Sequence, residues 1–202
     1  MLTLSFRFIS LIWMQSIKVV MVGDTQVGKS CVLSKLIHGS IDLNTPPTIG
    51  AAYLTKIIAT PESQVRLQIW DTAGQEKFRS LAPMYYRSAN VVVLVFDVTS
   101  KSSLENLDDW AAEIADKAPQ GVKTVVLGNK IDLINERCIS STDGKAAANA
   151  IGAAIYAETS AFTGDGIDDV FYQISRLDSS LDSIIETTAK RRSNDSETSK
   201  CC

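Results

Sequence analysis

The stretch GDTQVGKS at residues 23–30 decides the fold expected for this chain. It fits the pattern G-x-x-x-x-G-K-[ST], whose two glycines let the backbone turn so tightly that successive N–H groups point at a chain of phosphates. Lys29 adds a positive charge beside the β- and γ-phosphates, and the Ser30 hydroxyl is a ligand for Mg²⁺. The stretch therefore predicts a loop that binds the phosphates of a nucleotide together with a magnesium ion.

The residues on both sides of this loop support the prediction. Residues 17–22 form an apolar run that is typical of a strand buried within a parallel sheet. Residues 31–37 predict a helix whose N-terminus, the positive end of the helix dipole, faces the phosphates. A chance match to the pattern would lack these flanking elements.

The composition is that of an ordinary globular protein. Of the 202 residues, 45% are hydrophobic and 21% are charged, so a sizeable core is available. The net charge of -3 gives no indication of nucleic-acid binding, which usually needs a basic face, and we expect no such partner. Cys31 and Cys138 form no C-x-x-C metal pair, which fits a reducing cytosol. No apolar run approaches the roughly 18 residues of a membrane span.

Beyond the loop, strands and helices are expected to alternate. Apolar or alternating runs predict further strands at residues 50–59, 64–70, 91–96, 122–127 and 153–157. Helical spacing predicts further helices at residues 104–117 and 141–150, and a last helix from Ile167 to about residue 187. This alternation predicts an α/β fold with a six-stranded, mostly parallel sheet and helices on both faces. Ligands of such sheets bind at the carboxyl ends of the strands.

The two ends of the chain fall outside this pattern. Residues 1–16 lack the basic start and the cleavage site of a signal peptide, and a membrane-touching segment is one alternative. We expect instead that the native chain starts at Met14, which mass spectrometry tests, because a native peptide containing Phe6 would contradict it. The nucleotide-binding domain is then expected at residues 17–187, followed by a polar, flexible tail at residues 188–202.

A second motif follows the third predicted strand. Asp71 is placed to hold Mg²⁺ through water, and Gly74 lets its backbone N–H reach a γ-phosphate. Gln75 is placed to orient an attacking water. These residues predict hydrolysis of the terminal phosphate.

A third set of residues selects the base. Asn129, Lys130 and Asp132 follow the fifth predicted strand. The Asp132 carboxylate can accept from both the ring N–H and the exocyclic amine of guanine, whereas adenine offers no matching pair of donors. Ser160 and Ala161, after the last strand, can present backbone N–H groups to guanine O6. The set predicts GTP and GDP as ligands and disfavours the alternative of an ATP-using kinase.

Together these motifs resemble the Ras-like small GTPases and, within them, the Rab branch. The resemblance covers about residues 17–175 and the last two residues, and it implies the small G-domain form of the P-loop NTPase fold. Thr48, 18 positions after Ser30, matches the switch threonine that binds Mg²⁺ and the γ-phosphate. Residues 48–53 and 71–86 look like those of the early-endosomal group.

The motifs and the resemblance assign a role to each site residue. Gln75 and Lys29 are the expected catalytic residues. The expected Mg²⁺ ligands are Ser30, Thr48 and Asp71. The residues expected to bind the nucleotide are Gly23, Asp24, Thr25, Gln26, Val27, Gly28, Lys29, Ser30, Cys31, Thr48, Gly74, Asn129, Lys130, Asp132, Ser160, Ala161 and Phe162.

The resemblance also implies a function and partners. It implies a GTP/GDP-regulated switch in vesicle and endosomal membrane traffic, which hydrolyses GTP slowly and needs an activating protein. The other implied partners of its monomeric G domain are an exchange factor, effectors, an escort protein and a dissociation inhibitor. Tyr53, Trp70 and Tyr85 match the aromatic triad that effectors contact. Cys201 and Cys202 match a double-cysteine end with geranylgeranyl groups, which implies the cytoplasmic face of endosomal or vesicle membranes, in exchange with the cytosol.

Three residues depart from the family pattern. Gln26 stands where a small residue is usual, and a larger side chain there would obstruct water or an incoming arginine finger. A nucleotide-dependent binding module with negligible GTP turnover is therefore an alternative, unless Gln26 points to solvent. Ile41 stands where the family has a phenylalanine against the base, and Phe162 where it has a lysine. We hypothesise that Phe162 stacks on guanine with Ile41 at its edge; the alternative is that Phe162 is merely exposed.

Overall fold

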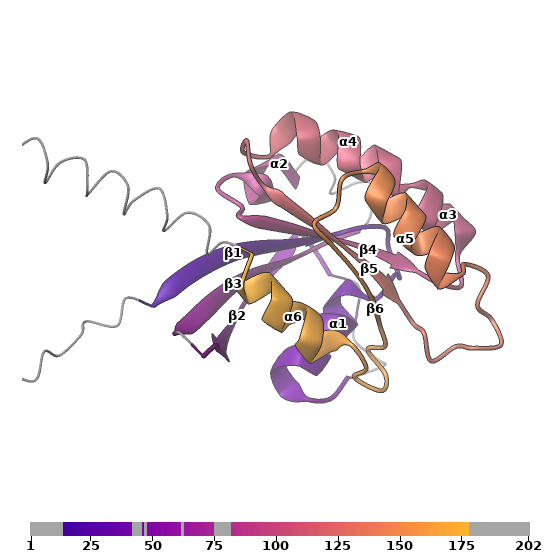
Figure 1. The fold of residues 1–202 in the computed structure, drawn as a ribbon, viewed down its shortest axis with the longest axis horizontal. Coiled ribbons are helices and arrows are strands. Elements are labelled where there is room, and N and C mark those ends of the chain that lie inside the picture. The colour runs from indigo at the N-terminus through magenta and orange to yellow at the C-terminus, as the bar shows by residue number, and fades with distance from the viewer. Residues whose placement is uncertain (1–13, 42–45, 47, 62, 75–81, 178–202) are drawn as a thin grey trace, which may run out of the picture.

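The computed structural model describes residues 14–41, 46, 48–61, 63–74 and 82–177 (Figure 1). The strands are β1 (Gln15–Val22), β2 (Ala51–Ala59), β3 (Gln64–Thr72), β4 (Val91–Asp97), β5 (Lys123–Asn129) and β6 (Ile155–Thr159). The helices are α1 (Lys29–His38), α2 (Ala82–Tyr86), α3 (Lys101–Glu105), α4 (Leu107–Lys117), α5 (Ser141–Ala150) and α6 (Ile167–Ser175). Most of the expected extension at residues 1–16 and all of the expected tail at 188–202 lie outside the described residues.

The strand pairing confirms the predicted α/β fold. The strands form one six-stranded sheet in the order β2-β3-β1-β4-β5-β6. β2 and β3 pair antiparallel, as expected for a hairpin, and the other neighbouring strands pair parallel. Because β1, β3, β4, β5 and β6 run in the same direction, the loops that follow them meet at one edge of the sheet.

Helices cover both faces of the sheet, with α1 and α6 on one face and α2, α4 and α5 on the other (Figure 1). Successive side chains of a strand point to opposite faces, so β1 contributes to both cores. Val19 packs in the core under α1 and α6, whereas Val20 packs in the core under α2, α4 and α5. Leu33 of α1 and Phe171 of α6 are fully buried, and burying each such side chain contributes about 1.5–3 kcal/mol.

Two helices differ from their predicted extent. The helix expected at residues 104–117 is two helices, α3 and α4, which are separated at Asn106. The helix α6 ends at Ser175, because the N–H of Arg176 bonds the Gln173 carbonyl only three residues back. Residues 178–187 of the expected last helix lie outside the described residues. Leu177 nevertheless packs against the core, so the apolar spacing continued past the last helical residue.

The last strand is displaced by two residues from its prediction, since it runs over Ile155–Thr159 and not over residues 153–157. The first two residues of the predicted strand, 153 and 154, instead follow the turn after α5. In that turn Gly152 has a φ of 69°, and the Ala153 N–H bonds back to the Ala148 carbonyl. The short helix α2 was not predicted, although its Tyr86 is fully buried.

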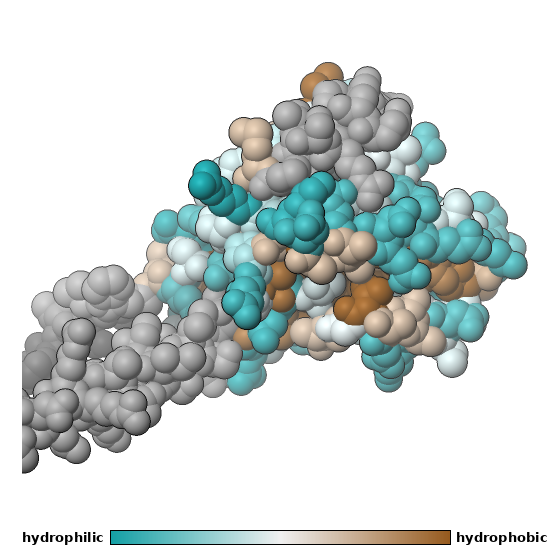
Figure 2. Space-filling model, turned by 90° about the horizontal axis from the view of Figure 1, so that it is seen from above, coloured by the Kyte–Doolittle hydropathy of each residue, from teal (hydrophilic) through white to brown (hydrophobic). Residues whose placement is uncertain are grey.

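Figure 2 shows that the face seen from above is largely hydrophilic, with apolar side chains gathered in small separate areas. Within the described ranges, no helix is both long enough and apolar enough to cross a lipid bilayer.

Candidate functional site

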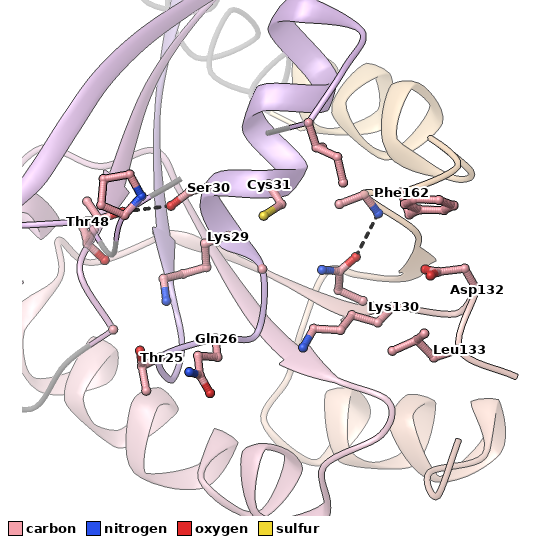
Figure 3. Close-up of a pocket in the computed structure, with 17 residues that line it drawn as sticks. Thr25, Gln26, Lys29, Ser30, Cys31, Thr48, Lys130, Asp132, Leu133 and Phe162 are labelled. Carbon is pink, nitrogen blue, oxygen red and sulfur yellow. Dashed lines mark hydrogen bonds between the residues drawn. The ribbon is translucent and has the colours of Figure 1, made fainter. Parts of the chain in front are cut away.

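A cavity of about 670 Å³ lies where the loops after the parallel strands meet. The loop after β1 forms one wall, and the loops after β5 and β6 form the opposite end (Figure 3). The predicted nucleotide residues that line it are Thr25, Gln26, Gly28, Lys29, Ser30, Cys31, Thr48, Gly74, Asn129, Lys130, Asp132, Ala161 and Phe162. The cavity therefore brings together segments from five separate parts of the chain.

The glycines of the loop at residues 23–30 are required by its geometry. Gly23 has a φ of 133°, and a Cβ there would lie 2.2 Å from the Val95 carbonyl oxygen. Gly28 has a φ of 96°, and a Cβ there would lie 2.4 Å from the Asn129 amide nitrogen. A side chain at either position would push the loop out of place, so the pattern in the sequence reflects both backbone conformation and close approach.

Lys29 places a buried amine at the phosphate end of the cavity. Its Nζ donates to the Gly23 carbonyl at 2.8 Å and to the Asp24 carbonyl at 2.7 Å. Burial lowers the pKa of Lys29 to about 8, although the carboxylates of Asp71 and Asp24 raise it. An anion bound in the cavity would therefore favour the charged form of this amine.

Two hydroxyls and a carboxylate meet beside Lys29. The Ser30 hydroxyl donates to Asp71 Oδ2 at 2.6 Å and lies 2.8 Å from the Thr48 hydroxyl. Burial raises the pKa of Asp71, while hydrogen bonds from Ser30 and Thr48 and the charge of Lys29 lower it. Asp71 Oδ1 is buried and has no hydrogen-bond partner among the described residues. Oxygen ligands of this kind suit a hard cation such as Mg²⁺, so the cluster fits the metal predicted for it.

Asn129 connects the phosphate loop to the other end of the cavity. Its Nδ2 donates to the Val27 carbonyl at 2.9 Å, and its Oδ1 accepts from Thr159 Oγ1 at 3.2 Å and from the Ala161 N–H at 3.3 Å. The side chain is 1% exposed. It therefore links three segments in the interior, where a lost hydrogen bond is costly.

Asp132 is held by the loop after β6. Its Oδ1 accepts from the Ser160 hydroxyl at 2.6 Å, and that hydroxyl oxygen in turn accepts from the Thr163 N–H at 3.0 Å. Figure 3 shows Asp132 beside Phe162 and Leu133, at the opposite end of the cavity from Thr48 and Ser30. The Asp132 carboxylate thus lies at one end of the cavity, and the hydroxyls of Ser30 and Thr48 lie at the other.

Asp97 is a part of the site that sequence reasoning missed. Its Oδ2 pairs with Lys130 Nζ at 2.6 Å, and Lys130 has a φ of 70°. The pair fixes the lysine that lines the cavity between the phosphate loop and Asp132. A signal was present, because Asp97 directly follows the predicted strand at residues 91–96 and so falls at the ligand-binding edge of the sheet.

Gln26 and Phe162 both line the cavity from exposed positions. Gln26 is exposed and has a φ of 64°, a left-handed conformation that is uncommon for residues other than glycine. The side chain of Phe162 is 63% exposed, and Ile41 lines the same cavity. Stacking of Phe162 on a base and obstruction by Gln26 stay predictions.

The three predicted effector residues form one aromatic cluster away from the cavity. The ring centroids of Tyr53 and Trp70 are 5.3 Å apart, and those of Trp70 and Tyr85 are 5.6 Å apart. Lys18 Nζ lies 5.5 Å from the centre of the Trp70 ring, so a cation supports the cluster. Three other predicted residues, Gln75, Cys201 and Cys202, lie outside the described residues.

Comparisons with known proteins find related sequences that cover most of the chain. A family model described as "Ras family" matches residues 18–178. The human Ras-related protein Rab-22A is 37% identical over 193 residues, which are 94% of this chain and 99% of that protein. The mouse Ras-related protein Rab-31 is 41% identical over 80% of this chain and 83% of its own. The GTP-binding protein ypt5 of Schizosaccharomyces pombe is 41% identical over 79% of this chain and 76% of its own.

The lowered pKa of Lys29 predicts proton uptake when the nucleotide-free protein binds GDP. A group whose pKa rises on binding takes up protons at pH values between its free and bound pKa. With a free pKa of about 8, the number of protons taken up should be larger at pH 8.5 than at pH 7. Isothermal titration calorimetry in buffers of different ionisation enthalpy measures this number. Lys29→Arg is the control, since a guanidinium stays protonated throughout. Equal proton uptake by the wild-type protein at both pH values would contradict the prediction.

Proposed function

The chain belongs to the Ras family, and from that premise we propose that it is a Rab-like small GTPase acting in endosomal membrane traffic. The observation that carries the proposal is the arrangement of one cavity, with Asp132 at one end and Lys29, Ser30, Thr48 and Asp71 at the other. The comparisons support the family and the hydrolysis of GTP. The remaining steps are inferred from the residues.

Guanine is bound by Asp132 in this proposal. The Ser160 hydroxyl occupies Asp132 Oδ1 and so fixes the plane of the carboxylate. The carboxylate then accepts from the ring N–H and the exocyclic amine of guanine, a pair that adenine lacks. The buried hydrogen bond from Asn129 to the Val27 carbonyl holds the base end of the cavity at a fixed distance from the phosphate loop.

The phosphates are bound by the loop at residues 23–30. Lys29 supplies a positive charge, and loop N–H groups point at the phosphate oxygens. Ser30 and Thr48 would hold Mg²⁺, with Asp71 behind them, and the ion would supply positive charge that offsets the negative charge of the β- and γ-phosphates. Gln75 orients the water whose oxygen attacks the γ-phosphorus as the bond to the bridging oxygen breaks, giving GDP and phosphate.

The switch lies in the segment that carries Thr48. Among the described residues, the Thr48 hydroxyl reaches Ser30 and Asp71. Loss of the γ-phosphate removes a ligand from this segment and from Gly74, which releases both. Binding proteins then distinguish the GTP form from the GDP form.

Partners are proposed at two further places on the chain. The cluster of Tyr53, Trp70 and Tyr85 offers half-exposed aromatic area to effectors, since Tyr53 is 50% exposed. Cys201 and Cys202 carry geranylgeranyl groups that anchor the monomeric domain to endosomal or vesicle membranes, because two lipid chains hold a protein firmly where one does not. An exchange factor, an activating protein, an escort protein and a dissociation inhibitor complete the cycle between membrane and cytosol.

Single-turnover hydrolysis of GTP tests the function. The wild-type protein should convert bound GTP to GDP, and Gln75→Leu should bind GTP but hydrolyse it about tenfold more slowly or worse, because the attacking water loses its orienting group. Gln173→Leu on the exposed side of α6 makes the same chemical change far from the cavity and should leave the rate unchanged. Tight GTP binding without turnover by the wild-type protein would favour the binding module that Gln26 suggests.

Release of GDP tests the proposed role of Phe162. Phe162→Ala should speed release several-fold, since an aromatic contact is worth about 0.5–1.5 kcal/mol beyond burial. Ile41→Ala should have a smaller effect, and Phe162→Leu an intermediate one because it keeps apolar contact without the ring. The measurement is the dissociation rate of a fluorescent GDP analogue. Equal, negligible effects of the two alanine variants would end the proposal.

The membrane anchor is tested by fractionating cells. Replacing both Cys201 and Cys202 by serine should move the protein from membranes to the soluble fraction, and either single replacement should give partial loss. Cys138→Ser removes an exposed cysteine elsewhere and should leave the distribution unchanged. Membrane association that survives the double replacement would show that another feature anchors the chain.

A further inference from the structure

A pair of hydrogen bonds fixes the outer side of the phosphate loop. Asn106 Nδ2 donates to Asp24 Oδ2 at 2.7 Å, and Trp110 Nε1 donates to Asp24 Oδ1 at 3.0 Å. Each oxygen of the Asp24 carboxylate therefore has its own donor, although the donors lie 82 and 86 residues further along the chain. Hydrogen bonds to a charged acceptor are among the stronger ones in proteins.

The break between α3 and α4 provides both donors. Asn106 is the C-cap of α3 and the N-cap of α4, and its own N–H bonds the Ser102 carbonyl. Asparagine at such a position usually caps its helix through its side chain, but here the side chain makes no cap bond and reaches Asp24 instead. Trp110 lies four residues later, on the same face of the turn.

The backbone carbonyl of Asp24 lies beside Lys29 and Gly74. Its carbonyl accepts from Lys29 Nζ at 2.7 Å. A Cβ on Gly74 would lie 2.5 Å from the Asp24 carbonyl oxygen and 2.6 Å from Lys29 Nζ. Asp24 thus contacts the α3–α4 junction through its carboxylate, and Lys29 and Gly74 lie beside its carbonyl.

The hydrogen bonds to Asp24 hold the outer side of the loop beside a cavity. A second cavity, of about 470 Å³, lies between the loop and the α3–α4 junction, and its walls include Asp24, Gln26, Asn106 and Trp110. Gln26 within this loop has a left-handed backbone, a conformation that persists only where its surroundings enforce it. The bonds to Asp24 supply part of that constraint.

We propose that Asn106 and Trp110 are positioning residues that set the rates of nucleotide release and hydrolysis by holding the phosphate loop through Asp24. Neither residue touches the nucleotide in this scheme. Loss of either donor lets Asp24 shift, and Lys29 and Gly74 shift with it. The hydrolysis part of the proposal rests on the GTPase function proposed above, whereas the part on GDP release does not.

The test is a set of double-mutant cycles on GDP release and on single-turnover GTP hydrolysis. Trp110→Phe keeps an aromatic ring and Asn106→Ala removes no cap bond, so both should fold. Each should speed GDP release and slow hydrolysis by about three- to tenfold, where tenfold corresponds to about 1.4 kcal/mol. In an Asp24→Ala background, Trp110→Phe should cause no further change in either rate, because the acceptor is already gone.

An exchanged pair and a matched control separate positioning from general stability. Asn106→Asp sets two carboxylates against each other and should change both rates more than Asn106→Ala does. The pair Asp24→Asn/Asn106→Asp restores a donor and an acceptor and should recover part of the wild-type rates. Tyr86→Phe, which removes a buried hydroxyl that bonds Glu113 of the same helix α4, should change neither rate.

Two results would overturn the proposal. One is a fall in the thermal unfolding temperature of Trp110→Phe with both rates unchanged, since that is a purely structural role. The other is full additivity with Asp24→Ala, since the residues then act independently. If the wild-type protein binds GDP but hydrolyses no GTP, the GTPase function fails, and the GDP-release cycle still decides whether the α3–α4 junction positions the loop.

Discussion

The hydrogen bonds of the Asn129 side chain join the two halves of the site. This one amide binds the phosphate loop through Val27 and the last loop through Ala161, and it projects from the end of β5, so three sequence-distant segments share one buried group. The absence of a side chain at Gly28 is part of the same arrangement, because a Cβ there would collide with this amide. Asn129 therefore helps to fix the separation between the base end and the phosphate end of the cavity, which a nucleotide of fixed length requires.

The sheet makes this convergence possible. Parallel pairing sets Asp97 beside Asn129 and Asn129 beside Thr159, so residues at the ends of three strands become neighbours in space. Two cores, one on each face, hold these strands rigid. The reactive groups then sit on short loops whose ends cannot move, which is the usual way a stable scaffold supports chemistry.

Much of this follows from the sequence, for physical reasons that differ between its parts. The loop at residues 23–30 and the strands carry local patterns, namely glycine spacing and apolar or alternating runs, so they were predictable. The break at Asn106 was not, because its side chain is held by Asp24 in a distant part of the chain. Apolar spacing located the face of the last helix but not its end at Ser175, since periodicity reports burial and not backbone bonding. The ion pair between Lys130 and Asp97 was missed because the position of Asp97 after a predicted strand indicates the ligand-binding edge of the sheet and not its partner.

Lys29 and Asp71 also connect the nucleotide concentration to the stability of the folded protein. Both are buried charged groups, and the burial that lowers one pKa and raises the other is a cost to the folded chain. Phosphates and a cation would offset that cost, so a ligand that binds only the folded form stabilises it in proportion to the logarithm of its concentration. The folded population then follows the nucleotide pool of the cell. Quality-control proteases would remove the chain faster when that pool falls, which makes abundance a second readout of the same cavity.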